Sequence, residues 1–449
     1  MIATIKRLLP VLAASALLTT VMPSATTASG ISGLEGDEIE MSFSLLTSEF
    51  YKKVDQQVAL DGARAEMADF LDHSGVKDAK IPVLHAVEDP ATNAKNLERE
   101  VNALASLYGS RVGGSRPLTY EAIAGLLSSV KDKYTTFLTP RQYADLNEGL
   151  DGGNFSGVGI SIQVDDKTKF LIVNEVIPDG PAEKAGLQSG DVIVLIDGKS
   201  TKGLTSDQDA KMLRGDKGTV VKLTIERSGA EIPVIAVTRD TIHQPSVYSK
   251  LLDGGIGYAR LTVFGQNTAD ELSTALTKLQ AQGAKAYVLD LRDNGGGYLN
   301  SAIDVSSKFI ASGPIVSVES RGGNDTQYDA ENTAIPPKPL AVLVNRYTAS
   351  ASEITSGAIQ DDGVGALIGE KTYGKGVVQT IHPLPDGSAV KITTARYLTP
   401  RGRDINLIGI QPDIISIEPK TAKLGDPLTD PQLQSAVTYL QGKIASAGT

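Results

Sequence analysis

Apolar residues recur at three- and four-residue spacing through the first part of the chain. The pattern runs over residues 41–72 and returns over 94–108 and 118–131. Such spacing places apolar side chains on one face of an α-helix. The sequence therefore predicts a helical N-terminal region over residues 31–115, and it does not disclose what this region does.

The pattern changes to alternation after residue 156. The strings GVGISIQV and FLIVNEV alternate, and GDVIVLIDG ends in an Asp–Gly turn. Short helices are expected in PAEKAGL and over residues 206–213. Alternation of this kind is typical of half-buried strands. Residues 157–240 are therefore predicted to form a compact, β-rich binding module.

From about residue 255 onward, apolar strands alternate with helices. The strings IGYARLTVF, AYVLDLR and PLAVLVN are the clearest strands. This alternation is typical of an α/β fold whose strands are buried. We predict an α/β core over residues 241–420, with a first part at 116–156 and a C-terminal helical segment at 421–449.

The first residues have the layout of a secretory signal peptide. Lys6 and Arg7 precede an apolar run over residues 8–21, and small residues follow at 24–28. The run is shorter than the ~20 residues that cross a bilayer. Residues 1–28 therefore predict export to the periplasm or the extracellular space. An uncleaved segment that keeps the protein at a membrane is the alternative.

Composition narrows the classes of function. The chain has 449 residues, a formal net charge of -10 and no cysteine. An acidic balance argues against nucleic acid as the main partner. The lack of cysteine excludes thiol nucleophiles, disulfides and cysteine-based zinc sites. No metal ion or organic cofactor is implied.

The β-rich module resembles a PDZ domain. The resemblance lies in GVGISI, in PAEKAGLQSGDVIVLIDG and in LRGDKGTVVKLTIERSG. In such domains a loop presents backbone N–H groups to a terminal carboxylate, and the peptide adds as a strand to the sheet edge. The loop here would consist of Gly157, Val158, Gly159 and Ile160. Alternatively, these glycines only shape a turn.

The string NRYTASASEITSGAIQ follows a predicted strand and opens a helix. Ser350 falls at this junction, where the N–H groups of the helix start could stabilise a developing oxyanion. The alternative is that Ser350 or Ser352 merely caps the helix.

The string GEKTYGKGVVQT offers a base for that hydroxyl. Lys375 stands between two glycines and precedes an apolar strand. Burial in a poorly solvated cleft lowers the pKa of a lysine, and a neutral amine can take a proton from serine. His382 is the rival base. A third string, VLDLRDNGGGYL, could present a backbone N–H from residues 295–297.

Together these strings resemble the C-terminal processing peptidases, also called tail-specific proteases. The matching segments are DLRDNGGG at 290–297, SASE at 350–353 and TYGKGVVQ at 372–379. The resemblance implies a crotonase-like α/β core gated by the PDZ domain. It also implies roles for five residues: Ser350 as nucleophile, Lys375 as general base, Gln379 as the group that orients the lysine, and the N–H groups of Gly296 and Ala351 as the oxyanion hole.

The chain departs from the family pattern in places. Gly295 stands where proline is usual, and residues 73–115 look like an insertion, which leaves family-like dimerisation through that part open. Ser128 and Lys131 form an S-x-x-K pattern without the companion K-T-G of penicillin-recognising enzymes, and are expected on a solvated helix face.

The function we expect is a serine endopeptidase with a Ser–Lys dyad. Its substrates would be exported proteins with free, apolar C-terminal tails, and Arg214 is the candidate that couples tail binding to catalysis. An activating adaptor and a homo-oligomer stay open. A non-catalytic PDZ scaffold and a thioester-specific crotonase are the alternatives.

Overall fold

The chain divides into two compact units. The computed structural model describes residues 30–150, 155–165, 167–177, 180–242, 245–419 and 424–447. One unit contains the described residues up to Phe43 together with Gln56–Ser129, and the other contains Ser44–Asp55 together with the described residues from Val130 onward. The predicted signal peptide lies outside the described residues.

The first unit is helical, as its apolar spacing predicts. Its elements are α1 (Gly33–Glu49), which continues into the second unit, α2 (Gln56–His73), α3 (Pro90–Tyr108), the 3₁₀-helix η1 (Gly109–Arg111) and α4 (Arg116–Ser128). Helices α2 and α4 approach closely at two glycines, because a Cβ on Gly62 would lie 2.6 Å from the carbonyl oxygen of Gly125. Packing against α2 places α4 in this helical unit, whereas the sequence assigned residues 116–156 to the core.

The predicted binding module folds around one sheet. Its strands are β3 (Ile160–Val164), β4 (Leu171–Val176), β5 (Val192–Ile196), β6 (Lys199–Ser200), β7 (Val220–Arg227) and β8 (Ala230–Thr238), and its helices are α6 (Pro181–Lys184) and α7 (Ser206–Leu213). The strand order β3-β4-β5-β7-β8 leaves β3 at an edge, while β6 pairs with β5. The chain enters through β2 (Phe155–Gly157) and leaves through β9 (Asp240–Ile242), which pair with each other.

A six-stranded sheet forms the centre of the core. In spatial order its strands are β10 (Val247–Leu252), β11 (Ile256–Leu261), β12 (Ala286–Asp290), β15 (Leu340–Val344), β16 (Ala366–Gly369) and β19 (Ile414–Ile415). Strand β10 is antiparallel to β11, and the later neighbours are parallel. Every residue of β12 and β15 is buried.

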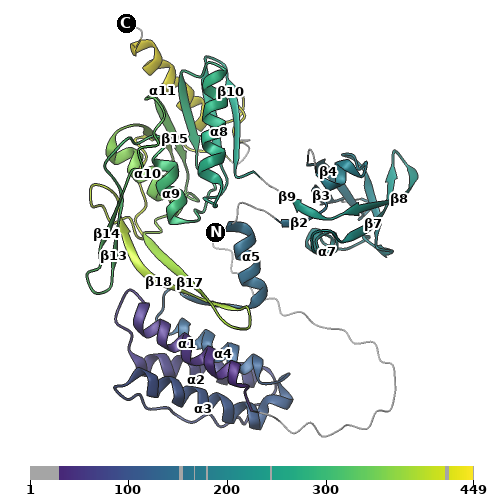
Figure 1. The fold of residues 1–449 in the computed structure, drawn as a ribbon, viewed down its shortest axis with the longest axis vertical. Helices are drawn as coiled ribbons and strands as arrows, with labels where there is room; N and C mark the ends of the chain where they lie inside the picture. The colour runs from purple at the N-terminus through teal and green to yellow at the C-terminus, as the bar shows by residue number, and fades with distance from the viewer. Residues whose placement is uncertain are drawn as a thin grey trace. The chain divides into compact units, whose positions relative to one another are not determined.

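Helices cover both faces of this sheet (Figure 1). Alternate strand residues pack on one face against α8 (Thr268–Ala281), α9 (Leu299–Ser306) and α10 (Ala351–Asp362), and on the other face against α11 (Pro431–Ala447). Burial on both faces explains why these strands read as continuous apolar runs. The mixed α/β core predicted from the sequence is thereby confirmed.

A second, antiparallel sheet completes the core. It contains β1 (Thr136–Leu138), β13 (Pro314–Ser320), β14 (Thr326–Asp329), β17 (Val377–Pro383) and β18 (Ala389–Leu398). Strand β18 pairs with β1, β13 and β17. The helix α5 (Pro140–Leu150) follows β1 directly along the chain.

The three strings of candidate chemistry follow three neighbouring parallel strands. Residues 291–297 follow β12, residues 345–350 follow β15, and residues 370–376 follow β16. Because the carboxyl ends of parallel strands meet at one edge of a sheet, the fold brings these loops together.

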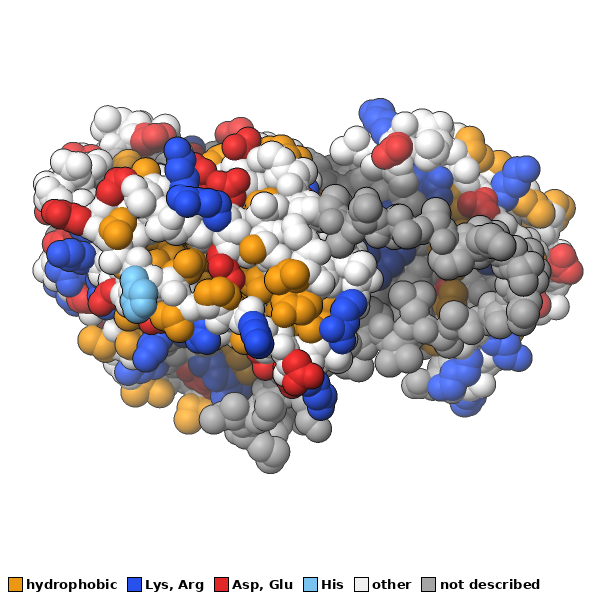
Figure 2. Space-filling model, turned by 90° about the horizontal axis from the view of Figure 1, so that it is seen from below, with side chains coloured by type: hydrophobic (Ala, Val, Ile, Leu, Met, Phe, Trp, Pro, Cys, Tyr) orange, Lys and Arg blue, Asp and Glu red, His pale blue; other side chains and the backbone are white. Residues whose placement is uncertain are grey.

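The described residues on the face drawn in Figure 2 include basic, acidic and apolar side chains. Lys and Arg side chains are interspersed there with acidic and apolar side chains, so the described residues of this face form no continuous basic surface. Within the described ranges, no helix combines the length and the apolar composition needed to cross a membrane.

Candidate active site

Ser350 occupies a strained turn between β15 and α10. Its backbone has φ +57° and ψ −119°, a conformation that residues other than glycine rarely adopt. Its N–H donates to the carboxylate of Glu353 at 3.0 Å, and its carbonyl oxygen accepts from the Tyr397 hydroxyl at 3.2 Å. Two contacts thus hold a conformation of the kind that clusters at functional sites.

Ser352 is a poor candidate for chemistry. Its side chain is fully buried, and its hydroxyl donates to the carbonyl oxygen of Asn294 at 3.0 Å. The same carbonyl accepts from the N–H of Ala349 at 3.0 Å. Asn294 therefore fastens the loop after β12 to the turn that carries Ser350.

Gly296 lies directly against Ser350. A Cβ at Gly296, where φ is +101°, would come within 2.8 Å of the Ser350 Cβ and 2.9 Å of the Ala351 nitrogen. Only glycine permits this approach. The Gly296 N–H donates to the Asn294 side-chain oxygen at 2.9 Å, so this candidate oxyanion donor already has an internal acceptor. Ala351 is the first residue of α10, where N–H groups have no partner within the helix.

Glu353 connects the turn that carries Ser350 with the turn that carries Lys375. Its carboxylate is fully buried. It accepts from the Thr372 hydroxyl at 2.5 Å, from the Gly374 and Lys375 N–H groups at 2.7 and 2.8 Å, and from the Ser350 N–H. Burial raises the pKa of this carboxyl, while the donors act to lower it. Sequence reasoning missed this role, although Glu353 stands in the SASE string.

Lys375 has the environment of a lysine base. Desolvation, followed by the like charge of Lys391, lowers the pKa of Lys375 to about 8. At pH 7 roughly a tenth of such a lysine is neutral. The Lys375 ammonium lies 4.8 Å from the centre of the Tyr134 ring, and the Lys375 carbonyl oxygen accepts from the Tyr397 hydroxyl at 2.7 Å.

One cavity brings the predicted catalytic residues together. Its volume is about 540 Å³, and it is lined by Ser350, Lys375, Gln379, Gly296 and Ala351. Other described residues complete its wall: Leu146, Leu150, Gly295, Gly297, Tyr298, Leu299, Ile354, Val377, Val378, Thr380, Ile381, Lys391 and Tyr397. Apolar side chains and several polar side chains share this wall.

Parts of the chain match two known families. The model of peptidase family S41 matches residues 255–416, and a PDZ model matches residues 172–227. A carboxyl-terminal-processing protease of Picosynechococcus is 40% identical over 331 residues, which cover 73% of this chain and 80% of that protein. The carboxy-terminal processing protease CtpA of Bacillus subtilis is 39% identical, over 72% of this chain and 67% of that protein.

The chain belongs to peptidase family S41. It is a serine protease of the carboxyl-terminal-processing type with an internal PDZ domain. A solved structure of a photosystem II D1 C-terminal processing protease is similar as well, with 31% identity, 92% coverage of this chain, 98% coverage of that chain and a TM-score of 0.49.

Gln379 of this S41 peptidase lies on β17, next to a bulge in its pairing with β18. Its side-chain nitrogen donates to the Thr393 hydroxyl at 3.5 Å, a long hydrogen bond. That hydroxyl in turn donates to Asp132. Asp132, Thr393, Tyr134 and Lys391 lie around the candidate dyad, and sequence reasoning missed all four.

His382 does not compete as the base of the S41 peptidase. Its Nε2 lies 2.8 Å from the Glu49 carboxylate, and it is not part of the cavity wall. The S-x-x-K pattern of Ser128 and Lys131 does not contribute to the cavity either. The Ser128 hydroxyl donates to the carbonyl oxygen of Gly125 in the same helix at 3.1 Å.

The residues predicted to form the PDZ loop of this peptidase lie between β2 and β3. Gly159 has φ +77°, its carbonyl oxygen accepts from Ile177, and the Val158 carbonyl oxygen accepts from Ala182. Gly157 ends β2 and Ile160 begins the edge strand β3, which contacts α7. An edge strand beside a helix is the arrangement that accepts a peptide as an added strand.

Arg214 directly follows α7 of the PDZ domain. Its guanidinium lies 3.0 Å from the Glu148 carboxylate of α5, the helix that contributes Leu146 and Leu150 to the cavity lined by Ser350 and Lys375. Arg239 supports the same turn, since it donates to the carbonyl oxygens of Met212 and Leu213 at the end of α7.

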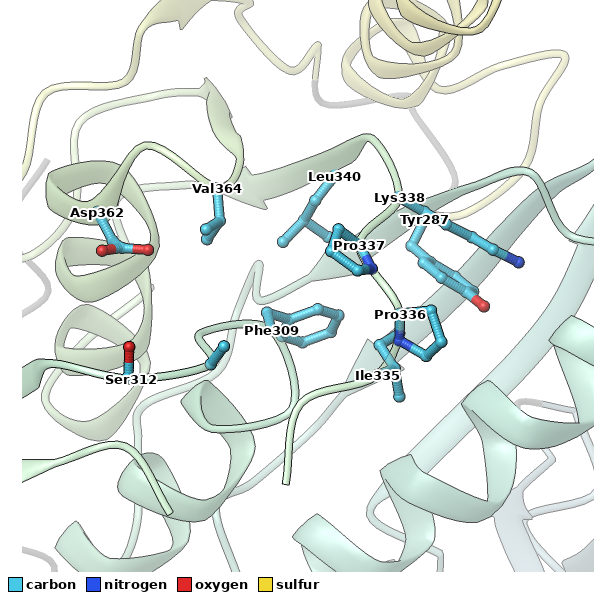
Figure 3. Close-up of a pocket in the computed structure, with 11 residues that line it drawn as sticks. Tyr287, Phe309, Ser312, Ile335, Pro336, Pro337, Lys338, Leu340, Asp362 and Val364 are labelled. Carbon is cyan, nitrogen blue, oxygen red and sulfur yellow. The ribbon is translucent and has the colours of Figure 1, made fainter. Parts of the chain in front are cut away.

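A separate cavity of about 310 Å³ lies at the amino ends of β12 and β15 (Figure 3). Phe309, Pro336 and Pro337 give it an apolar wall, and Asp362 stands at one side. None of the residues predicted for catalysis lines it. This cavity is therefore separate from the candidate active site.

Proposed function

We propose that the chain cleaves peptide bonds through an acyl-enzyme formed on Ser350, with Lys375 as the general base. One observation carries this proposal. Ser350 and Lys375 come from the ends of different strands and line the same cavity, where burial holds the pKa of Lys375 at about 8. A lysine with this pKa is neutral in part at physiological pH and can accept the serine proton.

The chemical steps follow from these positions. The Ser350 oxygen attacks the scissile carbonyl carbon while its proton moves to the Lys375 amine. The Ala351 N–H donates to the oxyanion, and the Gly296 N–H joins it once it exchanges the Asn294 oxygen for the substrate oxygen. The C–N bond then breaks, and the Lys375 ammonium protonates the leaving amine. Water releases the acyl group with Lys375 again as base, and Gln379 orients the lysine.

Substrate selection is assigned to the PDZ domain. We infer that Gly157, Val158, Gly159 and Ile160 receive the free carboxylate of an apolar C-terminal tail, because β3 offers an open strand edge beside α7. The pair Arg214–Glu148 would carry tail binding to α5 and so to the cavity wall. The basic and apolar start of the sequence supports exported proteins as substrates.

One assay tests the dyad and the tail selection. An unstructured protein with a free apolar tail is compared with its amidated form and its Asp-tailed form, using the parent enzyme and the Ser350→Ala and Lys375→Ala variants. We expect cleavage of the free-tailed protein by the parent enzyme alone. Parent-like turnover by Ser350→Ala would show that another group is the nucleophile, and equal cleavage of all three tails would remove the PDZ domain from selection. Absence of cleavage by the parent enzyme would favour a non-catalytic scaffold.

A further inference from the structure

A second lysine, Lys391, lines the catalytic cavity. It lies on β18, opposite Ile381 of β17 and Thr136 of β1, and its side chain is half-buried. In the described part of the chain, its ammonium has neither an ion pair nor a hydrogen bond. An ammonium that is removed from water usually has a partner, because an unpaired buried charge is costly.

The cavity has positive charge and no acid in its described wall. The wall carries the ammonium groups of Lys375 and Lys391, and none of its residues is Asp or Glu. The nearby carboxylates accept hydrogen bonds from other groups. Asp132 Oδ2 accepts from the hydroxyls of Thr135 and Thr393, although the charge of Asp132 still acts on Lys391, and Glu353 accepts from the donors around the two turns. In a protein of net charge -10, the described wall of this cavity thus differs in charge from the chain as a whole.

The partial burial of Lys391 also favours an anion in the cavity. Burial lowers the pKa of Lys391, and the charge of Asp132 opposes that change only in part. A carboxylate that entered the cavity would supply the missing acceptor and stabilise the charged form. Charge-assisted hydrogen bonds are stronger in poorly solvated surroundings than in water.

We propose that Lys391 is a specificity-determining residue that binds a carboxylate of the substrate beside the scissile bond. The carboxylate belongs either to an Asp or Glu side chain or to the end of the chain. This proposal rests on the proposed function of Ser350 and Lys375. The apolar wall formed by Leu146, Leu150 and other residues would receive the neighbouring substrate residues.

The expected preference is about tenfold in kcat/KM for Glu over Gln at one position, the value of a typical hydrogen bond to a charged group. A series of peptides carries Glu or Gln in turn at each position flanking the scissile bond. Each peptide is also made with a free and with an amidated C-terminus, which separates a side-chain carboxylate from a terminal one.

The variants are chosen to separate charge from shape. Lys391→Arg keeps the cation and should keep the preference. Lys391→Gln should abolish it, and Lys391→Glu should favour Lys over Gln at the same position. Lys391→Met, which keeps the apolar stem, serves as the neutral variant if Lys391→Gln melts at a lower temperature. The matched control Lys278→Gln removes an exposed lysine of α8, outside the cavity, and should behave as the parent enzyme.

Two outcomes would overturn the proposal. In one, the parent enzyme cleaves Glu and Gln peptides, and free and amidated peptides, at equal rates. In the other, the neutral variants retain the parent ratio and only shift the pH profile of all peptides together, which would mean that Lys391 acts solely through its repulsion of Lys375. If the parent enzyme cleaves no peptide at all, the proposed function itself fails, and this proposal fails with it.

Discussion

Replacing Glu353 by Gln tests how the turns that carry Ser350 and Lys375 are held together. The change keeps the shape of the side chain and removes one acceptor oxygen. In the parent protein each carboxylate oxygen accepts two hydrogen bonds, from Thr372 and Gly374 on one side and from Lys375 and Ser350 on the other. The amide of glutamine can satisfy one of these pairs, and its NH₂ group then faces the other pair.

The magnitude follows from the two donors that lose their acceptor. An unsatisfied buried donor costs about 1–3 kcal/mol, so two of them cost about 2–6 kcal/mol. Relief of the desolvation that raises the pKa of Glu353 offsets part of this cost. We expect a net loss of about 2–4 kcal/mol, shared between stability and transition-state binding, and a fall in kcat/KM of at least tenfold.

The assay combines kcat/KM on a tailed substrate with unfolding in urea. Asp362→Asn is the matched control, because Asp362 is an exposed acid at the other end of the same helix. The control should change neither quantity. If Glu353→Gln retains kcat/KM within threefold of the parent value and unfolds at the same urea concentration, the bridging role of this carboxylate is refuted.

Three further predictions follow from the site. The proposed base is the neutral amine of Lys375, whose pKa is about 8. We therefore expect kcat/KM to rise with pH to a plateau above pH 8 and to be about a hundredfold lower than this plateau at pH 6. A flat profile between pH 6 and 9 would contradict the dyad. Gly296→Ala should nearly abolish activity, because the new Cβ would collide with the Ser350 Cβ. Gly295→Ala should keep activity, because a Cβ at this position would lie in open space. Equal kinetics of the two variants would argue against the close approach of Gly296 to Ser350. Asp430→Asn should lower the free energy of unfolding by about 3–5 kcal/mol, because it weakens a fully buried ion pair with Arg292, and a urea midpoint equal to that of the parent protein would argue against this.

The sequence by itself determined the class of fold and the family. Apolar periodicity distinguishes helices from strands locally, and the runs now seen as β12 and β15 are continuous because both of their faces are buried. The family and the PDZ domain were recognisable from short strings with the right order, and the comparisons confirm both. The roles of Ser350, Lys375, Gln379, Gly296 and Ala351 stay predictions.

The tertiary structure decided which groups meet. Contacts between residues far apart in the sequence leave no local pattern, so neither the convergence of Asp132 and Thr393 near Gln379 nor the exposure of Lys391 to the cavity could be read from spacing. The placement of α4 with α2 depended on a close approach of two glycines that only packing reveals. The lowered pKa of Lys375 likewise results from burial and from a neighbouring charge. Both exist only in the folded chain.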